Sequence, residues 1–290
     1  MIPAPSGRIA VTRWPGSRPG PTALLIHATG FHSRLWDAVV ADLPDELTVI
    51  APDLRGHGRS ENKSPEPRWS AFGDDIIALI DHFSLEAAIG VGHSMGGWCA
   101  VYSALARPQA FANLLLIDPV LSEPHIYRTE AYAGLAGAHE HPVARRRSKW
   151  PSWQDFAARL AERPPFSLWQ RRILDDYCRY GLLPASDGDG FELACPPLVE
   201  ATVYFNRRYA DLNPRLGAVT CPVTVLRAAY APFDPTAPVD FSRSTTWPGL
   251  AEAFPHGRDI ERTDLTHFIP MQAPTDVARH IAEHAAAPRG

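Results

Sequence analysis

Residues 91–98 read VGHSMGGW and place Ser94 midway between Gly92 and Gly96. This is a G-x-S-x-G pattern, in which the serine hydroxyl stands on a turn too tight for larger neighbours. Such a serine can attack a carbonyl carbon as a nucleophile. The alternative is an ordinary turn in which the glycines only permit close packing. The elements on either side of Ser94 decide between the two.

Apolar segments typical of buried strands alternate with segments that have the hydrophobic spacing of helices. The expected strands are TALLIHA (22–28), LTVIAPD (47–53), AAIGVGH (87–93), ANLLLID (112–118), CPVTVLRA (221–228) and a weaker RDIERTDL (258–265). The expected helices span 34–43, 69–83, 96–106 and 274–286. Continuous apolar strands separated by helices predict βαβ units, and therefore an α/β fold with a mostly parallel, doubly wound sheet.

Ser94 thus follows a predicted strand and precedes a predicted helix. This is the setting that a nucleophile on a strand-to-helix turn requires. The amino-terminal end of the following helix also favours negative charge that develops beside it. The strand–turn–helix context therefore favours the nucleophilic interpretation, with Gly92 and Gly96 small because the turn is strained.

The interval from about 120 to 217 interrupts the alternation. It is rich in alanine, arginine, tryptophan and proline, has helical spacing at 153–162 and 168–180, and shows no convincing strand. We expect a mainly helical insertion, so that residues 1–119 and 218–290 form the core and residues 120–217 form a cap. An insertion here would lie over the carboxyl ends of the strands, where open α/β sheets bind ligands.

The composition limits the classes of protein to which the chain can belong. With 45% hydrophobic and 21% charged residues the chain is globular. A net charge of −4 argues against a nucleic-acid partner and favours a small neutral or mixed one. No apolar run approaches the roughly 20 residues of a membrane helix, and the first residues lack the pattern of a signal peptide. Four cysteines without CxxC spacing indicate free thiols in a cytoplasmic protein.

A histidine pair on the last predicted helix could imitate a metal site. His280 and His284 are four residues apart in HIAEH. The metalloprotease pattern, however, places glutamate directly after the first histidine. That glutamate is absent here, and we expect neither a metal nor a cofactor.

Four motifs in order resemble those of the α/β-hydrolases, and the resemblance covers nearly the whole chain. LLIHATGFHSRLW resembles the oxyanion loop after the third strand, and APDLRGHGRS resembles the turn after the fourth. GHSMGG resembles the nucleophile elbow of the haloperoxidase/esterase-like branch. LTHFIPMQAPTDVARHI resembles the loop of the catalytic histidine and the last helix. Ala28 departs from the family, which usually has glycine after the oxyanion-loop histidine.

The resemblance implies further site residues. His267 stands where the family has its base, and the backbone N–H groups of Thr29 and Met95 match the oxyanion hole. His27 is expected to shape the oxyanion loop. His93 is expected to point away from the nucleophile's side.

The acid that orients the base has two candidates. In most of the family it follows the strand after the cap, where this chain has TVLRAAYAPFDPTAPVD. The matching position there is Ala231, and Asp234 lies three residues later. Some members that hydrolyse lactones and esters instead place the acid after the strand that follows the nucleophile helix, which gives Asp118. We favour Asp118 because a strand end aims its carboxylate rigidly, whereas Asp234 is also suited to a turn before Pro235.

Several residues are candidates for the substrate pocket. Phe31 lies in the oxyanion-loop motif, and Trp150, Trp153 and Trp169 lie in the insertion. The tryptophans are equally suited to packing small helices together. The run ARRRSK (144–149) could attract an anionic substrate, but a solvated loop is the favoured interpretation.

The function expected from these residues is hydrolysis of a carboxylic ester or lactone through an acyl-enzyme, with a small hydrophobic substrate. The same residues could cleave C–C, thioester or amide bonds, or support perhydrolysis. A ligand receptor on the same fold is the alternative from another class, because a fold does not by itself fix function. The sequence gives no indication of oligomeric state.

Overall fold

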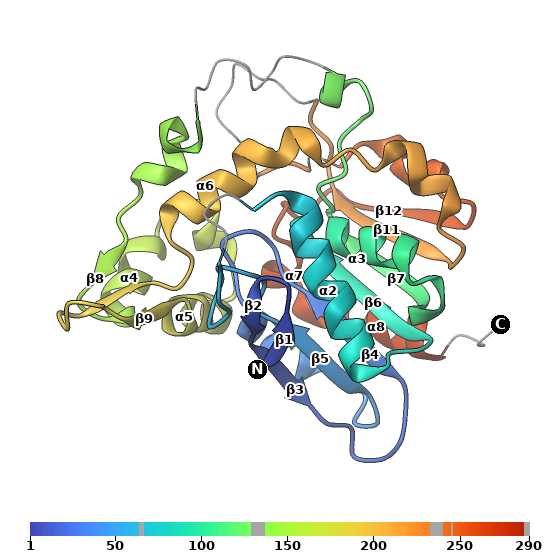
Figure 1. Ribbon diagram of the computed structural model, residues 1–290, viewed down its shortest axis with the longest axis horizontal. Helices are drawn as coiled ribbons and strands as arrows, with labels where there is room; N and C mark the ends of the chain where they lie inside the picture. Colours follow the sequence, from blue (N-terminus) through green and yellow to red (C-terminus); the bar gives the residue numbers. More distant parts are fainter. Residues whose placement is uncertain (64–66, 129–136, 233–239, 245, 287–290) are drawn as a thin grey trace.

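A seven-stranded sheet forms the centre of the computed structural model, which describes residues 1–63, 67–128, 137–232, 240–244 and 246–286 (Figure 1). The strand order is β12-β11-β7-β6-β4-β5-β3. The strands are β3 (Val11–Trp14), β4 (Thr22–Ile26), β5 (Thr48–Pro52), β6 (Ala88–His93), β7 (Phe111–Ile117), β11 (Val223–Ala228) and β12 (Gly257–Arg262). β3 at one edge is antiparallel to β5, and every other pairing in this sheet is parallel. The predicted α/β fold is confirmed.

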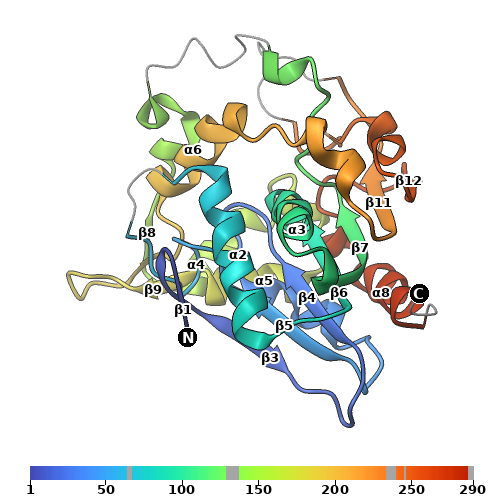
Figure 2. The same ribbon diagram turned by 45° about the vertical axis from the view of Figure 1, so that its right-hand side comes forward.

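Helices cover both faces of this sheet, as Figures 1 and 2 show. On β4, Leu24 and Ile26 face the helices α2 and α3, while Ala23 and Leu25 face α1 and α8. This alternation follows from the two-residue repeat of a strand and explains why a strand buried on both faces is apolar throughout. The helices are α1 (Asp37–Val40), α2 (Trp69–Phe83), α3 (Met95–Ala106) and α8 (Pro274–Ala286).

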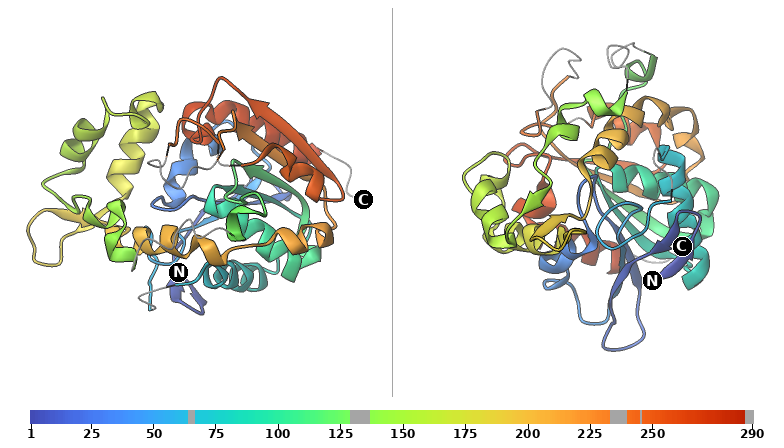
Figure 3. Two further views of the ribbon diagram at one scale, coloured as in Figure 1. Left: turned by 90° about the horizontal axis from the view of Figure 1, so that it is seen from above. Right: turned by 60° about the vertical axis from the view of Figure 1, so that its left-hand side comes forward.

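The chain leaves the sheet between β7 and β11 and forms a lobe at one end of the molecule (Figure 3). Its helices and strands are β8 (Lys149–Trp150), α4 (Trp153–Leu160), α5 (Arg171–Tyr180), β9 (Leu182–Pro184), β10 (Phe191–Leu193) and α6 (Pro197–Phe205). The expectation that this interval contains no strand was wrong, because β8, β10 and β9 form a small antiparallel sheet. These strands have only two or three residues each, too few for an alternating pattern to be visible in the sequence.

Three further short elements lie near the two ends of the chain. β1 (Ile2–Ala4) and β2 (Gly7–Ile9) form an antiparallel pair, and α7 (Ile269–Gln272) precedes α8. Within the part of the chain described, no helix combines the length and apolar character needed to cross a membrane.

Two tryptophans attach α6 and the turn after it to the core. Trp69 on α2 donates its Nε1–H to the Val203 carbonyl at 2.8 Å, and Trp98 on α3 donates to the Ala210 carbonyl at 2.6 Å. The two indoles meet edge to face with their centroids 5.4 Å apart. Val203 and Ala210 are themselves buried in the core cluster that contains both rings. α6 is therefore fixed relative to the sheet.

We predict that Trp98→Phe lowers the free energy of unfolding by about 1–3 kcal/mol. The substitution leaves the buried Ala210 carbonyl without its indole partner and removes packing volume. Urea unfolding followed by far-ultraviolet circular dichroism measures the change. Trp14→Phe, on the partly exposed edge strand β3, is the matched control and should lose less. Equal losses in the two variants would contradict the anchoring role.

Candidate active site

Ser94 occupies a strained turn between β6 and α3. Its φ of 56° and ψ of −118° are rare for a residue with a side chain. The surrounding backbone holds this conformation: Ser94 N–H donates to the Ile117 carbonyl at 3.0 Å, and the Ser94 carbonyl accepts from the N–H groups of Gly97 and Val120, each at 3.0 Å. Such strain persists only where neighbouring structure over-determines it. The end of β7 is part of that support.

The two glycines around Ser94 have no space for a side chain. A Cβ at Gly92 would lie 2.3 Å from the Gly96 carbonyl oxygen, and a Cβ at Gly96 would lie 2.1 Å from the Ile26 carbonyl oxygen. Both contacts are with backbone, which cannot rotate away as a side chain can. The close approach of α3 to β4 and β6 therefore requires glycine, in agreement with the sequence pattern.

Ser94, His267 and Asp118 come together although they lie far apart in the sequence. His267, in the loop between β12 and α7, has its Nε2 3.2 Å from Ser94 Oγ and its Nδ1 2.5 Å from Asp118 Oδ2. All three residues are buried, and Asp118 is fully buried. The alternative acid, Asp234, lies outside the described residues.

The end of β7 fixes the Asp118 carboxylate. Asp118 adopts a φ of 44°, a conformation that aspartate tolerates better than most residues. Its N–H donates to the Leu226 carbonyl at 2.8 Å, and its Oδ1 accepts from Ala228 N–H at 3.0 Å. Both partners belong to the neighbouring strand β11. The carboxylate is therefore held on the backbone of the sheet.

These contacts determine what the imidazole of His267 can do. A carboxylate accepts but does not donate, so Nδ1 carries the ring hydrogen and donates it to Asp118. Nε2 then presents a lone pair to the Ser94 hydroxyl. In this arrangement the imidazole can accept a proton from Ser94.

The two residues expected to form the oxyanion hole lie against each other. The Thr29 hydroxyl donates to Met95 Sδ at 3.5 Å. Met95 is the first residue of α3, where an N–H has no partner within the helix. Ala28, which replaces the usual glycine, is not among the residues with positive φ, whereas Gly30 has a φ of 78°. The loop makes its left-handed turn at Gly30, and an alanine fits at position 28.

His27 supports this loop from beneath. Its Nε2 accepts a hydrogen bond from Leu54 N–H at 2.9 Å, so Nδ1 carries the hydrogen and donates to the Ala28 carbonyl at 2.7 Å. Burial lowers the pKa of His27 to about 4 and keeps the ring neutral near pH 7. A neutral ring is what this pair of contacts requires.

His93 does not point away from the site, and that expectation was wrong. Its Nε2–H donates to the His267 carbonyl at 2.8 Å, and the two rings lie 5.1 Å apart. Burial lowers the pKa of His93 to about 3, so a neutral ring supports the loop that carries His267. The position of His93 next to Ser94 in the sequence did not indicate this contact, because the contact depends on where the distant His267 loop folds.

Aromatic rings connect the site to the insertion. The Phe31 ring packs on Trp169 and Tyr177 of the insertion, with centroids 5.6 and 5.5 Å apart, and on Phe268 at 6.1 Å. Phe268 in turn contacts the His267 ring at 5.3 Å. Tyr177 and Phe268 were not among the site residues predicted from the sequence. The sequence offered a signal for each of them. Tyr177 lies on the apolar face of its helix, and Phe268 directly follows the expected base, His267.

The other two tryptophans proposed for the pocket pack within the insertion. Trp150, on β8, lies against Phe156 at 4.6 Å and beneath the Arg147 guanidinium. Trp153 is partly buried at the start of α4. Trp150 belongs to the hydrophobic cluster that also contains Phe31, and Trp153 packs against that cluster.

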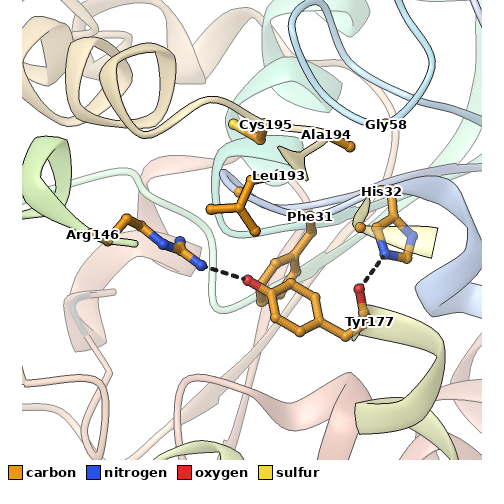
Figure 4. A pocket seen from close by; sticks show the side chains of 10 residues that line it. Phe31, His32, Gly58, Arg146, Tyr177, Leu193, Ala194 and Cys195 are labelled. Atoms are coloured by element: carbon orange, nitrogen blue, oxygen red, sulfur yellow. Dashed lines mark hydrogen bonds between the residues drawn. The ribbon is translucent and has the colours of Figure 1, made fainter. Parts of the chain in front are cut away.

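A small cavity lies between the insertion and the loops at the carboxyl ends of β4 and β5 (Figure 4). The residues that line it are Gly30, Phe31, His32, Gly58, Arg146, Tyr177, Gly181, Leu193, Ala194 and Cys195. Arg146 comes from the run ARRRSK, for which a solvated loop was expected. That expectation was wrong for Arg146, whose side chain is only 27% exposed and donates to Glu200 at 2.5 Å and to the Tyr177 hydroxyl at 3.3 Å.

All four cysteines are buried free thiols, as predicted. Within the described ranges, no three histidine, cysteine, aspartate or glutamate residues are grouped to hold a metal ion. His280 contacts Glu283 at 3.2 Å.

Known proteins resemble this chain over nearly its whole length. A profile of the alpha/beta hydrolase family matches residues 23–280. Lipase LipV from Mycobacterium tuberculosis is 30% identical over 274 residues, covering 90% of this chain and 92% of the lipase. 3-Oxoadipate enol-lactonase 2 from Acinetobacter baylyi is 24% identical, covering 89% of this chain and 86% of the lactonase. The crystal structure of E-2-(acetamidomethylene)succinate hydrolase shares the fold with a TM-score of 0.76 at 24% identity, covering 96% of this chain and 95% of that one.

We predict that Gly96→Ala lowers the free energy of unfolding by at least about 3 kcal/mol, because the new methyl group would overlap the Ile26 carbonyl. Thermal and urea unfolding measure the loss. Gly217→Ala is the matched control: a Cβ there meets open space and the φ is not positive, so the change should stay within about 0.5 kcal/mol. A Gly96→Ala protein as stable as the control would contradict the proposed packing.

We also predict that the free energy of unfolding falls as the pH falls from about 6.5 toward 4. Burial lowers the pKa values of His27 and His32 to about 4, and those of His57 and His93 to about 3. In this window the unfolded chain binds protons at these rings and the folded chain does not, so each histidine contributes about 1.4 kcal/mol per pH unit. Urea unfolding between pH 7 and 5 measures the slope. His57→Gln should reduce it, and a free energy independent of pH would contradict the prediction.

Proposed function

The chain belongs to the alpha/beta hydrolase family, and on that premise we propose that it is a serine hydrolase that cleaves a carboxylic ester or a lactone through an acyl-enzyme. The observation that supports this proposal most strongly is the pair of hydrogen bonds at His267, from Nδ1 to Asp118 at 2.5 Å and from Nε2 to Ser94 at 3.2 Å. The pair gives a serine hydroxyl, a base and an acid in the order that acyl transfer requires.

The proposed reaction starts at the Ser94 hydroxyl. Its oxygen attacks the carbonyl carbon while His267 Nε2 accepts the proton. The backbone N–H groups of Thr29 and Met95 bind the oxyanion of the tetrahedral intermediate. His267 then donates the proton to the leaving oxygen, the ester bond breaks, and the acyl group remains on Ser94. Water enters by the same proton path and hydrolyses the acyl-enzyme.

Asp118 is the proposed acid in this reaction. Its second oxygen is occupied by Ala228 N–H, so the carboxylate can hold the imidazole in one orientation and stabilise the positive charge that forms on it. The rigid support from β11 favours Asp118 over Asp234.

Relatives suggest the type of bond that is cleaved. Two relatives that match this chain along most of their own length are named as a lipase and an enol-lactonase. An ester or a lactone of a small, largely hydrophobic compound is therefore the proposed substrate. Thioester, amide and C–C hydrolysis and perhydrolysis use the same three residues and are alternative outcomes of a substrate panel.

Residues 120–217 are proposed to act as the lid of the site. The packing of Trp169 and Tyr177 on Phe31 supports this assignment, because Phe31 lies in the oxyanion-loop motif, two residues after Thr29. Phe31 and Trp169 are the proposed apolar walls of the substrate pocket. Trp150 and Trp153 would support these walls from within the insertion.

We predict that Ser94→Ala lowers ester or lactone hydrolysis by several orders of magnitude with the fold retained. Asp118→Asn should lower kcat by about 10⁴, because an asparagine no longer selects the reactive tautomer of His267. The measurement is a panel of esters and lactones, with intact-mass detection of an acyl adduct on Ser94. Asp234→Asn is the matched control and should keep near-native activity.

Two results would contradict this proposal. One is an unchanged rate in a clean preparation of Ser94→Ala. The other is a loss of activity in Asp234→Asn together with near-native activity in Asp118→Asn, which would transfer the role of the acid to Asp234.

A further inference from the structure

The cavity between the insertion and the core has one charged group on its wall. The roughly 260 Å³ of empty space at this site includes open solvent, and its enclosed part has room for little more than a water-sized group, such as a single oxygen. Most of its lining is backbone, aromatic or small apolar surface, and Arg146 supplies the charge. Figure 4 shows the guanidinium pointing at the Tyr177 hydroxyl, beside the ring of Phe31. A substrate group that enters the cavity therefore meets a guanidinium.

Arg146 already has an anionic partner. Its guanidinium donates to Glu200 Oε2 at 2.5 Å, and the Glu200 side chain is only 8% exposed. The other carboxylate oxygen lies behind the oxyanion loop, 2.9 Å from where a Cβ of Gly30 would be. Burial raises the pKa of Glu200, and the nearby Arg146 partly offsets this rise. The pair is balanced in charge before any ligand binds.

This balance determines which ligand is favoured. A carboxylate placed against Arg146 would put a second negative charge close to Glu200, with one positive charge for both. Burying such an unbalanced charge costs more than the contact returns. An uncharged oxygen adds no charge and can still accept a hydrogen bond from a donor of the guanidinium that is not directed at Glu200, since arginine has five donors.

We propose that this cavity binds an uncharged polar group of the substrate, a carboxamide, keto or hydroxyl group whose oxygen accepts a hydrogen bond from Arg146. This inference rests on the proposed function and narrows its substrate class to esters or lactones that carry such a group. Gly30 on the cavity wall follows Thr29, whose hydroxyl contacts Met95 next to Ser94, so the cavity adjoins the proposed oxyanion loop. Glu200 is then a specificity-determining residue that acts through Arg146.

The first experiment compares three series of phenyl esters whose acyl chains are equally long and end in a carboxamide, a carboxylate or a methyl group. Chains of two to five methylenes cover the unknown distance from Ser94. The native protein should show a kcat/KM for the carboxamide about tenfold or more above that for the carboxylate at the best length. Equal values for all three ends, or a preference for the carboxylate, would overturn the proposal.

Variants test the charge balance itself. Glu200→Gln keeps the shape of the side chain but removes its negative charge, so the ratio of kcat/KM for the carboxamide to kcat/KM for the carboxylate should fall at least tenfold.

The double variant Arg146→Met with Glu200→Met avoids leaving one buried charge alone. It should abolish any preference in kcat/KM for the carboxamide over the methyl end. Arg145→Met, at an exposed neighbour in the same run, is the matched control and should keep the native ratios. Unchanged ratios in Glu200→Gln would overturn the proposal.

A binding measurement separates this inference from the proposed function. Calorimetry measures the binding of the carboxamide-ended and carboxylate-ended compounds to Ser94→Ala, and this measurement needs no turnover. If the native protein hydrolyses none of the esters but Ser94→Ala binds the amides at least tenfold more tightly than the acids, the cavity assignment stands and the hydrolase proposal fails. Hydrolysis without any preference for the amides, in either rate or binding, would overturn the cavity assignment alone.

Discussion

The buried carboxylate of Asp118 is the group on which the arrangement of the site depends. A charge removed from water is tolerated only where hydrogen bonds surround it. Among the described residues, Asp118 accepts hydrogen bonds from Ala228 N–H of β11 and from Nδ1–H of His267. The first ties the carboxylate to the sheet, and the second ties it to a loop more than a hundred residues away in sequence. The need to satisfy one buried charge thus holds the His267 loop over the carboxyl end of β7.

The strain at Ser94 depends on the same edge of the sheet. The unfavourable φ of Ser94 is held by hydrogen bonds to Ile117 and Val120, which flank Asp118 on either side. The strand end that positions the Asp118 carboxylate therefore also supports Ser94. Gly92 and Gly96 let α3 start close enough to β4 for this turn to form. Strain is stored here because several neighbouring contacts determine the same backbone conformation.

The core could be predicted from the sequence because its signals are local. Continuous apolar strands and helical spacing located the sheet and its helices, and α2 and α8 have the predicted limits. Ser94 was evident from its own turn. By contrast, β8, β9 and β10 are too short to show a period. The contact of His93 with the His267 carbonyl, and the choice of Arg146 among three adjacent arginines for burial beside Glu200, depend on chain segments 174 and 54 residues away. No local pattern specifies such partners.

The division of residues between core and insertion has a consequence for specificity. Ser94, His267 and Asp118 all lie outside residues 120–217, and their mutual contacts use only the sheet and its loops. The cavity, in contrast, joins Gly30 and Phe31 of the core to residues of the insertion. α6, which carries Glu200, is held against α2 by the hydrogen bond from Trp69 to Val203, and the turn after α6 is held against α3 by the bond from Trp98 to Ala210. Substitutions within the insertion can therefore change the lining of the cavity while the hydrogen bonds among Asp118, His267 and Ser94 are retained, which is how one fold can support different specificities.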